Sequence, residues 1–80
     1  MRRRYLVRGL AQSPLWSGTL WAYGCNWLSS AELLFEKQRA NAEFDILELV
    51  DRTDRDERTG EYRVLRRTTV TNQRVNGTRH

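Results

Sequence analysis

Few residues of this chain could do chemistry, and they form no catalytic constellation. Cys25 is the only cysteine and His80 the only histidine among the 80 residues. A single cysteine cannot form an intrachain disulfide, and one cysteine with one histidine cannot complete a zinc site. No serine or cysteine has an internal histidine to activate it as a nucleophile, and the sequence contains no glycine-rich phosphate loop. The sequence therefore predicts no catalytic residue, no metal site and no cofactor.

Two groups of acidic residues come closer to functional motifs. Asp54, Asp56 and Gly60 suggest a calcium loop, but arginines intervene, and the glycine and final glutamate that such a loop needs are out of register. Glu32 and Glu36 lie four residues apart, as two acids on one helix face would. A role for Glu32 at the helix start, and an arginine three residues after Glu36, favour a solvated surface instead. We expect an interaction protein and not an enzyme.

Charge placement is more informative than these motifs. The formal net charge is +4, and arginine supplies nearly all of the positive charge because Lys37 is the only lysine. Residues 43–61 hold eight acids against three arginines, whereas both ends of the chain are basic. If the first and last strands lay side by side, their arginines would form one patch. Such a patch suits a nucleic-acid backbone or an acidic protein surface, and a plain solvated surface is the alternative.

The residues expected to bind a partner follow from this patch and from one tryptophan. In the last strand Tyr62 and Val64 are predicted to enter the core, which would leave Arg63 and Arg67 together on the exposed face. The predicted partner-binding residues are Arg4, Arg8, Arg63, Arg66, Arg67 and Trp16.

The elements that must position these residues follow from hydrophobic patterning. Alternating bulky residues bounded by glycine or proline predict strands. One segment, Glu43–Val50, has apolar residues on both faces and is therefore expected to be central in the sheet. Residues 51–61 are expected to form a charged connection, and residues 71–80 either add a short strand or stay loose. The predicted strands are Tyr5–Leu10, Thr19–Tyr23, Glu43–Val50 and a fourth that begins at Tyr62.

One helix is predicted between the second and third strands. Ser29 followed by Glu32 matches a capping box, and Leu28 with Leu33 matches the accompanying hydrophobic staple. The apolar stripe of this helix consists of Ala31, Leu34, Phe35 and Gln38. The order is ββαββ: an α+β fold in which one helix packs on one face of a mostly antiparallel sheet of four to five strands. Residues 1–80 form a single small domain.

Aromatic residues gather around the change from strand to helix. Thr19, Trp21 and Tyr23 would share one face of the second strand. Because one short helix supplies few apolar contacts, most of this cluster is predicted to fill the core. A docking surface at Trp16 or Trp27 is the alternative.

The N-terminal residues imitate a secretory signal without completing one. The apolar stretch after the first arginines is short, and Arg8 interrupts it. No segment approaches the roughly 20 apolar residues of a membrane span. We expect a cytoplasmic protein without membrane contact.

The sequence resembles small phage anti-CRISPR proteins that inhibit type I (Cascade) effector complexes, in particular one of the I-F set with a sheet-plus-one-helix fold. The resemblance covers roughly Tyr5 to Val70, while the tryptophans at 21 and 27, the arginine tail and the acidic hairpin depart from it. Its matching residues are Tyr5-Leu6-Val7-Arg8, Gly18-Thr19, Ala22, Leu28-Ser29 with Ala31, and Lys37-Gln38.

The resemblance implies an inhibitor that binds subunits of a CRISPR effector complex, of type I-C or I-F, in the cytoplasm of the host bacterium and blocks binding of target DNA. A small arginine-rich nucleic-acid-binding domain or phage regulator, with direct DNA contact, is the alternative. A structural subunit of a larger assembly is a third class. Open sheet edges and surplus tryptophans leave homodimer and monomer as alternatives.

Overall fold

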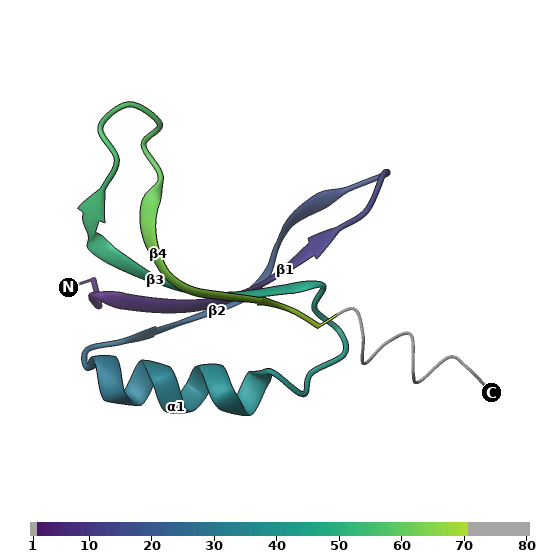
Figure 1. The fold of residues 1–80 in the computed structure, drawn as a ribbon, viewed down its shortest axis with the longest axis horizontal. Coiled ribbons are helices and arrows are strands. Elements are labelled where there is room, and N and C mark those ends of the chain that lie inside the picture. Colours follow the sequence, from purple (N-terminus) through teal and green to yellow (C-terminus); the bar gives the residue numbers. More distant parts are fainter. Residues whose placement is uncertain (1, 71–80) are drawn as a thin grey trace.

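The computed structural model describes residues 2–70 and has the predicted element order ββαββ. Four antiparallel strands form one open sheet and a single helix packs beneath it, which confirms the α+β fold (Figure 1). The predicted fifth strand falls within residues 71–80, outside the described residues. No helix of the described part is long and apolar enough to cross a membrane. The elements are β1 (Tyr5–Gln12), β2 (Ser17–Cys25), α1 (Leu28–Gln38), β3 (Ile46–Arg55) and β4 (Tyr62–Thr69).

The strand order is β2-β1-β3-β4, so β1 and β3 are central and β2 and β4 are the edges. The central position predicted for the third strand is confirmed. Because β3 lies between β1 and β4, the first and last strands are not neighbours. The ends of the β1–β2 and β3–β4 hairpins bend away from the side on which α1 lies (Figure 1).

The two faces of the sheet differ in what covers them. Val7, Leu47 and Leu49 are fully buried and belong to one core cluster with Ala31 and Phe35 of α1. We call this side the helix face. Residues opposite one another on neighbouring strands share a face, so the other side, the open face, is made by the alternate positions. The rows of the open face include Leu6 opposite Val50, Arg8 opposite Glu48, and Leu10 opposite Ile46.

The third strand begins and ends later than its pattern predicts. The structure has β3 at Ile46–Arg55, whereas the sequence predicts Glu43–Val50. Phe44 precedes the strand and is buried in the core. Residues 51–55 belong to the strand and not to a connection, because their charged side chains find partners on the neighbouring segments, as described below.

The helix also begins differently from the prediction. Trp27 is the N-cap residue and has no side-chain capping hydrogen bond, so Ser29 lies inside the first turn and the predicted capping box is wrong. Leu33 is 72% exposed and forms no hydrophobic staple. The predicted stripe is confirmed, since Ala31 and Phe35 are buried while Leu34 and Gln38 are half-buried.

A bulge in β2 changes which residues share a face. Gly9 lies opposite Trp21 but Leu10 lies opposite Thr19, so Leu20 is the extra residue. Trp21 therefore points to the helix face and Thr19 to the open face. The prediction that Thr19 and Trp21 share a face is wrong, because strict alternation does not hold across a bulge.

Gly9 lets an aromatic ring lie directly on β1. A Cβ atom at Gly9 would overlap the ring of Phe44. That ring also stacks on Trp21, with centroids 5.8 Å apart and an interplanar angle of 21°. Because Gly9 has no side chain, the stacked rings of Phe44 and Trp21 can pack against β1 at this position and cover the core beside α1.

We expect Gly9→Ala to destabilise the fold by about 1–3 kcal/mol, because the added methyl must displace the Phe44 ring. Gly24→Ala is the matched control: its Cβ would meet Arg3 Cβ and Nη2 of the flexible Arg52 side chain at 3.1 Å, without overlap with a ring. Urea unfolding of both variants measures the difference. Equal losses in the two variants would contradict this packing argument.

Candidate binding surfaces

Two buried carboxylates occupy the central strand β3. Glu48 is 4% exposed and interrupts the apolar run of this strand, and Asp51, which directly follows the run, is 6% exposed. Burying a charge is costly unless it is paired and hydrogen-bonded. The arginines that pair with these two acids determine where the positive charge of the molecule lies.

Glu48 lies between two arginines on the open face. It is opposite Arg8 of β1 and opposite Arg67 of β4 in the strand register. Arg8 Nε donates to Glu48 Oε1 at 2.8 Å, and Arg67 Nε lies 3.2 Å from Oε2. The Arg8 side chain is 20% exposed and the Arg67 side chain 59%. One carboxylate with two guanidinium groups leaves this triad with a net positive charge, which reaches solvent mainly at Arg67.

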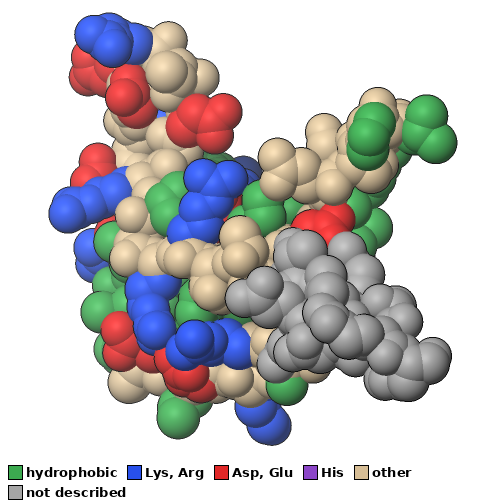
Figure 2. Space-filling view, turned by 45° about the vertical axis from the view of Figure 1, so that its right-hand side comes forward, with side chains coloured by type: hydrophobic (Ala, Val, Ile, Leu, Met, Phe, Trp, Pro, Cys, Tyr) green, Lys and Arg blue, Asp and Glu red, His purple; other side chains and the backbone are tan. Residues whose placement is uncertain are grey.

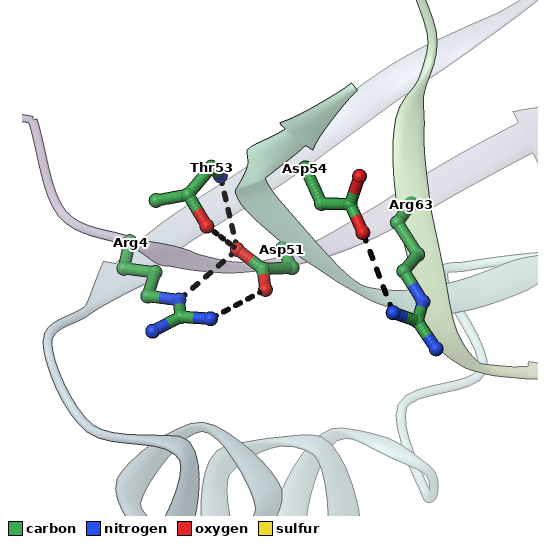
Figure 3. A network of polar contacts seen from close by, with 5 residues as sticks. All are labelled: Arg4, Asp51, Thr53, Asp54 and Arg63. Carbon is green, nitrogen blue, oxygen red and sulfur yellow. Dashed lines mark hydrogen bonds and ion pairs between the residues drawn. The ribbon is translucent and has the colours of Figure 1, made fainter. Parts of the chain in front are cut away.

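Asp51 joins the N-terminal segment to an irregular part of β3. Arg4 donates to it through Nε and Nη2, at 3.2 and 3.0 Å. The backbone N–H and the hydroxyl of Thr53 donate to Asp51 Oδ1 at 2.9 and 2.7 Å (Figure 3). The hydrogen bond from Arg4, and then those from Thr53, outweigh burial and hold the pKa of Asp51 well below its usual range.

A separate and exposed ion pair lies next to this site. Arg63 Nη1 lies 3.3 Å from Asp54 Oδ2, and both side chains are more than half exposed (Figure 3). Such an exposed pair contributes little stability. It nevertheless keeps the Arg63 guanidinium on the same side of the hairpin as Arg4.

Arg66 binds the helix. Its Cζ lies 4.6 Å from the centroid of the Phe35 ring, and its Nη1 lies 2.9 Å from Glu36 Oε2. The hydrogen bonds from Arg66 and Arg39 lower the pKa of Glu36. Glu36 therefore pairs with two arginines and does not form an acid pair with Glu32. Arg66 connects β4 to the helix.

The expected single arginine patch is not formed. One reason is that β1 and β4 are not neighbours. Another is a bulge in β4, which changes which face of the sheet the residues on either side of it point to: Leu49 lies opposite Arg66 but Val50 lies opposite Val64. Arg67 consequently faces the open side and Arg63 the helix side. Val64 is exposed while Leu65 packs against the core, so the predicted core position of Val64 is also wrong.

Trp16 lies at the turn of the first hairpin, and more than half of it is exposed. Ser13 fixes this turn, because its hydroxyl donates to Trp16 O at 2.8 Å and accepts from Trp16 N at 3.0 Å. The neighbouring Leu15 is almost fully exposed. Figure 2 shows hydrophobic side chains at the tip of this hairpin and charged side chains at the tip of the other.

The sequence reasoning missed Glu48 and Asp51 as the residues that organise the site. A signal was present for Glu48, which interrupts an apolar run in a strand expected to be central, where an unpaired charge would not be tolerated. Asp51 lies outside that predicted strand, in the expected charged connection. The sequence reasoning also missed that residues 9–31 contain no charged residue at all.

A groove between β2 and the end of α1 measures about 550 Å³. It is lined by Leu20, Trp21, Gln38, Asn41, Glu43 and Phe44. Within residues 2–70, no group of three or more His, Cys, Asp or Glu residues could hold a metal ion. No protein-family model matches the chain, and neither a curated protein nor a solved structure matches it.

We expect Asp51→Asn to lower the thermal midpoint at pH 7 by roughly 5–10 °C, because Arg4 loses its charged partner. The depressed pKa of Asp51 contributes stability that is complete above the ordinary carboxyl range and is lost as pH falls below about 4. The difference in thermal midpoint between wild type and Asp51→Asn should therefore become smaller below pH 4. Thermal scans from pH 2 to 7 measure it.

Asp54→Asn is the control for this series, because it removes a carboxylate from the exposed pair with Arg63. It should change the midpoint little at any pH. A constant difference between wild type and Asp51→Asn across the whole pH range would contradict the role assigned to Asp51.

Proposed function

We propose that this chain is a phage anti-CRISPR protein that binds a type I effector complex stoichiometrically and blocks its access to target DNA. The resemblance of residues 5–70 to inhibitors of these complexes supports the choice of partner. A small sheet that holds exposed arginines in fixed positions supports binding as the mode of action. Types I-C and I-F are the systems to test first.

The single observation that carries the binding role is the anchoring of exposed guanidinium groups by acids of the same sheet. Arg67 is held by Glu48, Arg4 by Asp51 and Arg63 by Asp54. An anchored guanidinium loses less side-chain entropy on binding, and its remaining donors suit a carboxylate or phosphate.

The alternation of acids and arginines favours a protein partner over nucleic acid. A surface that tracks a phosphate backbone gains affinity from uninterrupted positive charge. Here each of these arginines stands beside a carboxylate, which would repel phosphates nearby. A protein surface with its own mixed charges fits this pattern better.

Direct nucleic-acid binding has one observation in its favour. Arg2, Arg3 and Arg52 line a shallow groove together with the exposed Tyr23. Arginines around an aromatic ring can hold a backbone while a base stacks. In this second candidate function the chain would contact DNA through this groove, and Arg63 and Arg67 would be dispensable.

The test is co-purification of the chain with type I-C and I-F effector complexes, followed by a target-DNA binding assay over a titration of the inhibitor. We expect inhibition to be complete near one chain per binding site. Inactivation that progresses at sub-stoichiometric amounts would contradict a binding mechanism.

Arg63→Gln with Arg67→Gln should weaken effector binding at least tenfold while the fold is kept, because Arg8 still pairs with Glu48. Glutamine is chosen because a glutamate at position 67 would stand next to the buried Glu48. Arg55→Gln with Arg58→Gln removes the same charge from the far end of the hairpin and serves as control. Calorimetry or surface plasmon resonance measures the affinities.

If both double variants weakened effector binding equally, binding would depend on net charge alone and not on the positions of Arg63 and Arg67. Undiminished binding by Arg63→Gln with Arg67→Gln would remove these arginines from the interface. If that variant also bound duplex DNA as wild type does, with a steep salt dependence, the groove at Arg2, Arg3 and Arg52 would become the working surface.

A further inference from the structure

The edge strand β2 has only one of the devices that usually block strand addition, the bulge at Leu20. Among the described residues it is paired with β1 alone and forms one end of the sheet. Exposed edges are normally protected by charged side chains, proline or a covering element. β2 spans nine residues and contains no charge and no proline. Its backbone is therefore open to a further strand on the regular part beyond the bulge, from Trp21 to Cys25.

The two edges of the sheet contrast in charge. The whole segment from Gly9 to Ala31 has no charged residue, although 30% of the chain is charged. The other edge strand, β4, has Arg63, Arg66 and Arg67. The residues of one edge strand are thus uncharged, whereas those of the other include three arginines.

Exposed apolar side chains flank β2 on the helix face. The helix packs mainly over β1 and β3, so it leaves the outer part of β2 less covered. Tyr23 stacks on Trp21 with centroids 6.5 Å apart and remains more than half exposed. Half of Leu20 is exposed, and Trp27, at the start of α1, is 70% exposed.

We propose that the occupant of this edge is a second copy of the chain, with β2 paired antiparallel to β2 around a two-fold axis. A two-fold axis brings the same surface of both copies together, so an uncharged strand meets an uncharged strand. The two four-stranded sheets become one continuous sheet, and the exposed side chains of Leu20, Tyr23 and Trp27 from both copies lie along the shared seam.

A second copy fits better than a charged partner for two reasons. The residues of β2 offer no cation to an acidic protein or a nucleic acid, and the arginines beside it, Arg3 and Arg52, lie at Gly24 near its end. A dimer also places the two β4 edges at the outer ends of the sheet, so the arginines there stay accessible in duplicate. A domain of this size buries a modest part of its surface when folded alone, and association adds to that burial. The inference does not depend on the proposed partner.

The test is the mass of the chain in solution, measured by sedimentation equilibrium from 5 to 200 µM. We expect the wild type to reach twice its 9.5 kDa mass within this range. Thr19→Lys with Ala22→Lys places two exposed charges on β2, doubled across the axis, and should shift the dissociation constant upward at least thirtyfold. Circular dichroism verifies that the variant is folded.

Val64→Lys with Thr69→Lys is the matched control, because it adds the same charge to exposed positions of the other edge strand. It should dimerise as the wild type does. A wild type that stays monomeric at 200 µM would overturn the proposal. Dimerisation that survives the β2 charges, or that is weakened equally by the β4 charges, would overturn it as well.

Discussion

The fold depends on the burial of two carboxylates in the middle of its sheet. A charge at Glu48 or Asp51 is tolerable only with cationic hydrogen-bond donors beside it. Those donors come from Arg8 in β1, Arg67 in β4 and Arg4 before β1. Each pair also fixes strand register, because a shift by one residue would turn the partners to opposite faces. The acids therefore hold β3 between β1 and β4, and they determine where the guanidinium groups reach solvent.

Much of the fold could be predicted from the sequence. Element order, the antiparallel hairpins, the single helix and the central position of β3 all follow from apolar periodicity, which reflects burial directly. The errors have local causes. Bulges at Leu20 and Leu65 break the alternation on which face assignments rest. The capping box at Ser29 failed because Leu28 already belongs to the helix. Neither a bulge nor a helix start displaced by two residues produces a clear pattern in the sequence.

The candidate site was less predictable than the fold. The arginines could be named from charge placement, but their grouping depends on strand order and on the bulge in β4. Arg66 contacts the helix, and Arg63 and Arg67 lie on opposite faces of the sheet. Each of the three arginines is paired with a carboxylate. The result is a molecule with anchored arginines over one half of the sheet and an uncharged edge on the other.

Glu48 and its arginines should behave as one coupled unit in stability. A double-mutant cycle with Arg8→Gln, Glu48→Gln and the combined variant, followed by urea unfolding at pH 7, measures this coupling. We expect a coupling of about 1–2 kcal/mol, because each single substitution leaves a largely buried partner with one hydrogen bond fewer. Losses that add to within about 0.3 kcal/mol would contradict it and would reduce the triad to independent surface charges.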